Sequence, residues 1–217
     1  MAKLDGGLLG RVTGKIGGIV FSSARGPAGK LNTARSYVRP ANPNTTDQQT
    51  QRGFFSAAVE IVRRIGSSIY TNDWNRASGQ NAGFQSLVSV ILGAKTGSTN
   101  FTAPAEVNLG TLHAPATISL SAGSSSGEID VEWSTELGDN GTNADDVVII
   151  CYPVNKDGAA DATRDEATQT RADGATGVTI DGLVAGENHV IGVYLRGAGT
   201  AVDLLSPCQF DIVAAAS

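Results

Sequence analysis

The side chains that could perform chemistry in this sequence are few. There are two histidines, His113 and His189, and two cysteines, Cys151 and Cys208. Nucleophilic catalysis would need a thiol or hydroxyl beside an imidazole, with an acid to orient the ring. Cys151 and His189 both fall in stretches that we expect to be packed β-strands, where cysteine behaves as a small hydrophobe. We therefore predict no catalytic residue and no enzymatic activity.

An acidic loop is the second chemical candidate. Residues 139–146 hold five Asp or Asn side chains in eight positions, and their oxygens are the ligands that Ca²⁺ prefers. The loop lacks the D-x-[DN]-x-[DN]-G spacing with its distal Glu, and Asp and Asn also favour turns by themselves. A solvated turn is the favoured interpretation, with calcium as the alternative. The sequence predicts no metal ion and no cofactor.

A glycine cluster, Gly14-Lys15-Ile16-Gly17-Gly18, could suggest phosphate binding. It lacks the G-x-x-x-x-G-K-[ST] spacing, and no long helix follows it. Glycines that supply positive φ at turns and bulges are the simpler interpretation.

The basic side chains point to docking instead. Residues 1–103 hold 12 Lys and Arg against four Asp and Glu, a net charge of +8. Residues 104–217 hold four against 17, a net charge of −13. No helix-turn-helix or RNA-binding motif accompanies the basic residues. We expect the basic half to dock on an acidic protein surface, with nucleic acid or an ordinary solvated face as the alternatives. The expected docking residues are Arg35, Arg39, Arg52, Arg63 and Arg64.

The elements that must position these residues change type along the chain. Glycine-punctuated apolar stretches predict strands near 8–13, 17–23 and 31–38, with turns at Gly14 and at 25–29.

Two helices follow. Apolar residues at helical spacing predict a helix over 47–65, behind a capping box of Thr46 and Gln49 and with Phe54 and Phe55 in the core. A second helix is expected over 80–93. Tyr70 and Trp74 would form a short helical turn between them.

The sequence pattern of the second half predicts β-structure. Small polar residues with prolines at 94–116 predict a linker, which places a domain boundary between 1–103 and 104–217. Alternating and continuous apolar stretches beyond it predict six or seven strands, as in an all-β sandwich. No apolar run has the length of a membrane span and no secretory signal precedes the chain, so we expect no membrane partner and synthesis in a host cytoplasm.

The second half resembles a fibronectin type III domain. Trp133 stands in the second strand, and Leu183, Gly186 and His189 occupy the places of that family's tyrosine corner, with His189 where the family has tyrosine. The resemblance implies a binding or spacing module with Trp133, Leu183 and His189 in its core. It also places another strand between those of Cys151 and Cys208, so both thiols should be free.

The first half resembles an uncharacterised group of phage and prophage proteins. The resemblance rests on the glycine cluster at 14–18, on Val38-Arg39-Pro40, and on a segment that reads Asn42-Pro43-Asn44-Thr45-x-x-Gln48-x-x-x-Arg52-x-x-Phe55. It implies a virion setting and an Ig-like C-terminal domain.

Together these observations predict an α+β protein. A glycine-rich β segment with two or three helices precedes a fibronectin-III-like β-sandwich. The expected function is that of a structural component of a tailed-phage virion, a capsid decoration or a head–tail accessory protein. Its partners would be capsid or tail proteins and further copies of itself. The alternatives are an adhesion module that contacts the host surface through the sandwich and a nucleic-acid-associated protein.

Overall fold

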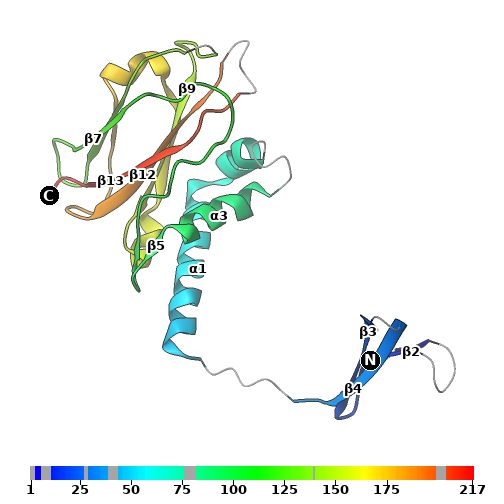
Figure 1. Cartoon of the computed structure of the whole chain (residues 1–217). Helices are drawn as coiled ribbons and strands as arrows, with labels where there is room; N and C mark the ends of the chain where they lie inside the picture. The colour runs from blue at the N-terminus through cyan, green and yellow to red at the C-terminus, as the bar shows by residue number, and fades with distance from the viewer. Residues whose placement is uncertain are drawn as a thin grey trace. The chain divides into compact units, whose positions relative to one another are not determined.

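The computed structural model describes residues 3–5, 11–26, 29–38, 44–75, 82–138, 140–198 and 204–217. The chain forms two compact units, Met1–Asn44 and Thr45–Ser217, which we call unit 1 and unit 2 (Figure 1). The charge pattern predicts a division between residues 103 and 104. The structure places the division before the first long helix. The helices of unit 2 share a hydrophobic core with its sheet, which explains this position.

Unit 1 is an antiparallel sheet with the strand order β1-β2-β3-β4. Its strands are β1 (Lys3–Asp5), β2 (Arg11–Ile16), β3 (Ile19–Gly26) and β4 (Gly29–Ser36). The tight turn between β2 and β3 lies at Gly17 and Gly18, and Gly17 has a φ of 56°, which favours glycine. The turn expected at Gly14 is wrong, because Gly14 continues β2 and pairs with Phe21.

Unit 2 begins with a helical layer. It contains α1 (Thr46–Ile65), a π-helical turn η1 (Ile69–Trp74) and α3 (Gly83–Gly93). The side chain of Thr45, one residue before the expected cap, accepts a hydrogen bond from the backbone N–H of Gln48. Gly66 ends α1 with a φ of 97°.

The rest of unit 2 is a two-sheet sandwich. One sheet has the order β11-β8-β7 and the other β10-β9-β12-β13, and all neighbouring strands are antiparallel. The strands are β7 (Ile118–Ala122), β8 (Ile129–Trp133), β9 (Asp146–Pro153), β10 (Thr163–Thr170), β11 (Val178–Ile180), β12 (Asn188–Arg196) and β13 (Gln209–Ala214). Two 3₁₀ turns, η2 (Lys156–Asp161) and η3 (Arg171–Ala175), flank β10. This is the expected α+β architecture with a fibronectin-III-like sandwich.

The sequence pattern does not predict strand β10. Its sequence, TRDEATQT, has no apolar alternation, because β10 lies at the edge of its sheet and pairs only with β9. An edge strand can be polar where a central strand cannot.

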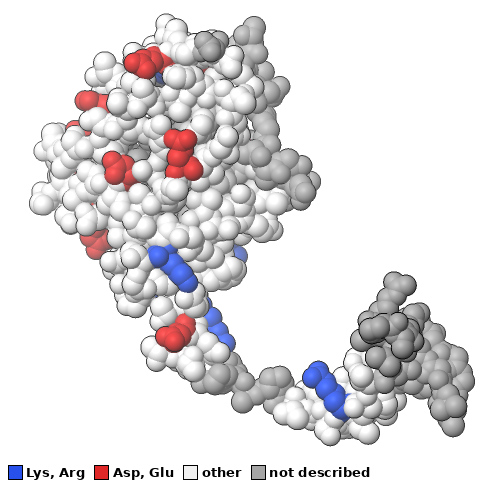
Figure 2. Space-filling view, in the orientation of Figure 1, with Lys and Arg blue, Asp and Glu red and all other residues white. Residues whose placement is uncertain are grey.

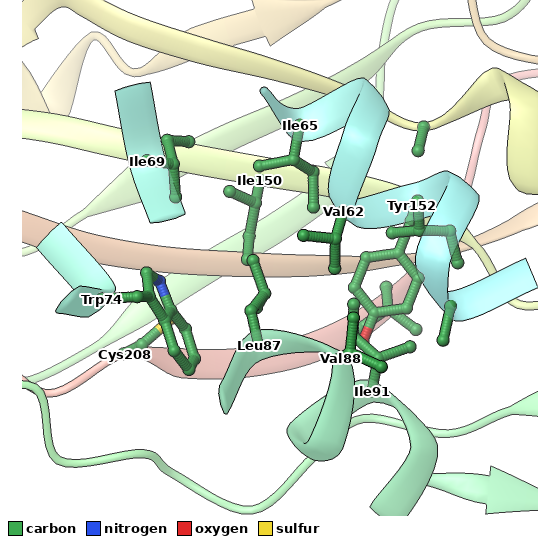
Figure 3. Packing of buried hydrophobic residues seen from close by; sticks show 14 of the residues in the cluster. Val62, Ile65, Ile69, Trp74, Leu87, Val88, Ile91, Ile150, Tyr152 and Cys208 are labelled. Carbon is green, nitrogen blue, oxygen red and sulfur yellow. The ribbon is translucent and has the colours of Figure 1, made fainter. Parts of the chain in front are cut away.

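The two central strands explain the position of the unit boundary. Nearly every residue of β9 and β12 is buried, so both faces of their sheet are covered. One face packs against the three-stranded sheet through residues such as Ile149 and Val193. The other face packs against the helices, where Val62 and Leu87 meet Ile150 (Figure 3). A sheet that is apolar on both faces needs two covering layers, so α1 and α3 fold with the sandwich.

The segment 94–116 is also part of this core, and the expectation of a linker there is wrong. It forms a two-stranded hairpin from β5 (Lys95–Thr96) and β6 (Asn100–Phe101). The Phe101 ring is buried, with its centroid 5.3 Å from that of Phe54 and 6.3 Å from that of Tyr152. Leu109 and Leu112 are buried as well.

A buried polar cluster ties η1 to the sheet. The Asp73 carboxylate accepts a hydrogen bond from the Tyr194 hydroxyl at 2.5 Å. It also accepts two hydrogen bonds from the Arg196 guanidinium, at 2.7 and 3.1 Å. Asp73 is 1 % exposed, so its charge is compensated by partners from β12 rather than by water.

Candidate docking groove

An open apolar groove runs between α1 and α3. It has a volume of about 280 Å³ and is lined by Phe55, Val59, Phe84, Gln85, Val88, Ser89 and Leu92. Phe55 is 56 % exposed, which is the largest exposure of any large apolar side chain described in unit 2. The expectation that Phe55 lies in the core is therefore wrong.

Helix geometry explains why Phe55 is left outside. Phe54, Ala58, Ile61 and Ile65 repeat at helical spacing and are all fully buried against the sheet. Phe55 stands about 100° further round α1 than Phe54, and Val59 follows one turn later on that side. The rings of Phe84 and Tyr70 pack edge to face, with centroids 5.2 Å apart, which holds Phe84 at the opposite wall.

Basic side chains border the groove. Arg52 and Lys95 line an adjoining hollow of about 410 Å³ together with Gln51, Phe55 and Leu92. The Lys95 ammonium donates a hydrogen bond to Gln51 at 2.7 Å. Arg63 is exposed one helical turn beyond Val59. The groove thus combines apolar walls with positive charge at its rim.

Three of the five expected docking arginines lie on one helix of unit 2. Arg52, Arg63 and Arg64 lie exposed on α1 in unit 2. Arg64 forms an exposed pair with Glu60 at 3.0 Å, a contact of small energetic weight. Arg35 lies exposed on β4 in unit 1, and Arg39 falls outside the described residues.

Charge is also segregated within unit 2. On the face drawn in Figure 2, most acidic side chains lie over the sandwich and the basic ones lie along the helical part. On this face of unit 2, acidic and basic side chains therefore occupy different regions.

The thiols and the buried histidine are enclosed. Cys151 and Cys208 are buried and free, as the strand order β9-β12-β13 requires. Burial raises the pKa of the Cys151 thiol to about 12 and also raises that of Cys208, so neither is a nucleophile at neutral pH. His189 is fully buried. Its Nδ1 lies 3.0 Å from the carbonyl oxygen of Glu187, and its Nε2 has no hydrogen-bond partner among the described residues.

In the acidic loop, the carboxylate oxygens of Asp145 are hydrogen bonded to other groups of the protein. Asp145 is buried, and its two carboxylate oxygens accept hydrogen bonds from Thr142, Ala198 and Arg171. Burial raises the pKa of Asp145, but these hydrogen bonds and the Arg171 charge outweigh burial and hold the pKa below its usual value. Asp139 lies outside the described residues. In the part of the chain that the structure describes, no group of three His, Cys, Asp or Glu side chains is arranged to hold a metal ion.

The other residues expected in the core lie inside. Trp133 and Leu183 are 4 % and 8 % exposed, and the Trp133 indole N–H donates to the carbonyl oxygen of Arg171 at 3.3 Å. No helix within the described ranges has the length and apolar character needed to cross a bilayer. The groove is missing from the sequence-based expectations, although its signal is present: Phe55 and Val59 make the apolar stripe of α1 wider than contact with one sheet requires.

Comparisons with known proteins add a family and a set of distant folds. A model described as "Family of unknown function (DUF6266)" matches residues 11–202. No curated protein matches the sequence significantly.

Several solved structures show a distant likeness to this chain. The FN1-FN3 domains of chicken CNTN1 are 19 % identical over 53 % of this chain and 33 % of that one, with a TM-score of 0.36. The fn3 domain of human contactin 1 is 19 % identical over 57 % and 95 %, with a TM-score of 0.34. Domains d3-d4 of rat CD45 are 9 % identical over 48 % and 51 %, with a TM-score of 0.34. The chain thus spans a third of the chicken structure and about half of the rat one. The strand order of the two sheets, and not these likenesses, defines the sandwich.

Proposed function

The chain belongs to DUF6266, a family of unknown function, and from that premise we propose that it is a non-enzymatic protein-interaction module. The groove between α1 and α3 is its docking site. The partner segment places one or more apolar side chains against Phe55, Val59 and Leu92 and carries acidic residues toward Arg52 and Lys95.

The exposure of Phe55 is the observation that carries this proposal. A phenylalanine ring that is more than half exposed, on a helix whose other apolar residues are buried or partly buried, is unfavourable in water and favourable in an interface. Aromatic anchors surrounded by complementary charge are typical of the energetic centre of protein interfaces. The apolar walls of the groove suit an amphipathic helix or an extended apolar segment.

The finer proposal is that the assembly is a tailed-phage virion. It is supported by the resemblance of the N-terminal motifs to phage and prophage proteins and by the segregation of basic and acidic surfaces. In a particle that carries many copies, weak docking through one groove is sufficient, because the effective concentration of neighbouring sites is high.

A photo-cross-linking experiment tests both the groove as the docking site and the virion as the assembly. The full chain carries p-benzoylphenylalanine at position 55, or at Ser119 on the outer face of β7 as the matched control, and is produced during phage growth. We expect a cross-link from position 55, but not from position 119, to an identified capsid or tail protein in purified particles. Absence of the protein from intact particles would refute the virion role. Equal cross-linking at both positions would refute the groove as the docking site.

A further inference from the structure

The described side chains in the sheet of unit 1 form no buried core. Side chains are described at residues 14–22 and 33–38 of the sheet, and none of them is buried. Ile16 and Ile19 are 50 % and 46 % exposed, and Val38, just beyond β4, is 75 % exposed. An isolated antiparallel sheet is stable in water only when one of its faces is packed against something.

The pairing register sorts the described side chains into two faces. Ile16 pairs with Ile19, Ile19 with Ser36, and Phe21 with both Gly14 and Ala34. Since paired residues share a face, these positions form one surface, which we call face A: Gly14, Ile16, Ile19, Phe21, Ala34 and Ser36. Face A contains no charged residue among the described positions.

The opposite face, face B, is polar and basic. Val20 pairs with Lys15 on β2 and with Arg35 on β4, so it lies between two cations. The Ser22 and Thr33 hydroxyls are hydrogen bonded at 2.7 Å on the same face. The Lys15 ammonium lies 3.5 Å from the centre of the Tyr37 ring, a cation–π contact. The cations therefore point away from face A.

We propose that face A packs against face A of a second copy of the chain, so that two unit-1 sheets form a small intermolecular β-sandwich. Stacking two apolar sheet faces about 10 Å apart is the ordinary way in which an amphipathic sheet is covered. A two-fold axis through the pair makes each copy supply the surface that the other needs. The basic B faces of both copies remain outward, where their repulsion is smallest.

The size of the sheet fits such a pair. Strands β3 and β4 have eight residues each, and the sheet has four strands. The four strands together have 25 residues. At about 3.4 Å per residue and about 4.8 Å per strand, the face measures roughly 400 Å². Two faces bury roughly 800 Å², which is below the usual size of a stable interface and in the range of weak, transient ones. The expected dimer is therefore weak in solution and strengthened wherever many copies are held together.

The first test compares two substitutions at neighbouring positions in the full chain. Ile19→Glu places a charge on face A, whereas Val20→Glu places a carboxylate on face B between Lys15 and Arg35. Sedimentation equilibrium is measured from about 1 to about 100 μM, the range in which an interface of this size associates. We expect the wild type and Val20→Glu to reach twice the 22.2 kDa chain mass, and Ile19→Glu to dimerise at least tenfold more weakly. A monomeric wild type, or equal loss in both variants, would overturn the proposal.

The second test detects the face without adding charge. Ala34→Cys lies on face A and Thr33→Cys lies on face B, and the natural Cys151 and Cys208 are buried. A short bismaleimide should join two Ala34→Cys chains and leave Thr33→Cys chains single. Equal cross-linking of both variants, or capture of a different protein by Ala34→Cys in purified particles, would contradict self-association. Because the groove lies in unit 2, Phe55→Ala should leave the dimer mass unchanged, which separates this inference from the docking groove.

Discussion

Phe54 and Phe55 are chain neighbours on α1 with opposite environments. Phe54 is 0 % exposed and contacts Phe101, whereas Phe55 is 56 % exposed in the groove. One residue along a helix is a rotation of about 100°, which suffices to move a side chain from the core to the surface. Phe54 therefore contributes to the stability of the core, whereas Phe55 contributes exposed apolar surface to the groove.

This contrast makes a prediction at two adjacent positions. Phe54→Ala should lower the free energy of unfolding by about 3–5 kcal/mol, because it leaves a cavity in the helix–sheet core. Phe55→Ala should change stability by less than about 1 kcal/mol and abolish docking in a particle-binding assay. Urea denaturation and co-sedimentation measure the two effects. A Phe55→Ala variant that docks normally would exclude the groove.

His189 gives a pH prediction. Burial lowers its pKa below the ordinary 6.5, although the Glu187 carbonyl and the charges of Glu187 and Asp161 oppose this shift. The unfolded chain therefore takes up a proton at higher pH than the folded chain does, and stability should fall as the pH decreases below about 6.5. Above about pH 7.5 His189 is neutral in both states and should contribute no pH dependence.

Thermal unfolding between pH 7.5 and 5 checks this expectation. His189→Phe should flatten the fall in melting temperature within this window, and His113→Gln, at an exposed histidine, should retain it. An unchanged slope in His189→Phe would assign the pH dependence to other groups.

At the scale of elements, the Asp73 cluster holds η1 on strand β12. Asp73→Ala removes the partner of the Tyr194 hydroxyl and of the Arg196 guanidinium inside the protein. The expected loss is about 1–3 kcal/mol of unfolding free energy, because the buried Tyr194 hydroxyl loses its acceptor, whereas the Arg196 side chain is 21 % exposed. Tyr194→Phe removes one hydroxyl and should cost about 1–3 kcal/mol. Asp181→Ala, at an exposed position, is the control, and a loss as large as that of Asp73→Ala would show that the cluster is not responsible.

At the scale of the whole molecule, the helical layer belongs to the sandwich. A fragment 104–217, cut where the charge changes sign, would expose the helix-facing side of β9 and β12. We expect it to aggregate or to bind a hydrophobic dye, whereas a fragment 45–217 should unfold cooperatively. Cooperative unfolding of 104–217 alone would contradict the double-covered sheet.

The local elements of this protein follow from its sequence alone. The signals for these elements are local in the sequence: turn glycines, the helix-capping pattern of Thr46 and Gln49, and apolar periodicity. They are sufficient to predict α1, α3 and six of the seven sandwich strands. The fibronectin-like motif likewise indicates that Trp133, Leu183 and His189 lie in the core, and all three are buried. Strand β10 is not predictable, because an edge strand needs no apolar pattern.

Which faces are covered depends on the tertiary structure. The continuous apolar runs of β9 and β12 indicate buried strands, but not that α1 and α3 supply the second cover, since that depends on contacts between residues far apart in the chain. For the same reason Phe54 and Phe55 look alike in the sequence and differ in the fold. Burial is a property of neighbours in space, so the exposure of Phe55 in the groove is decided by the tertiary structure and not by the local sequence.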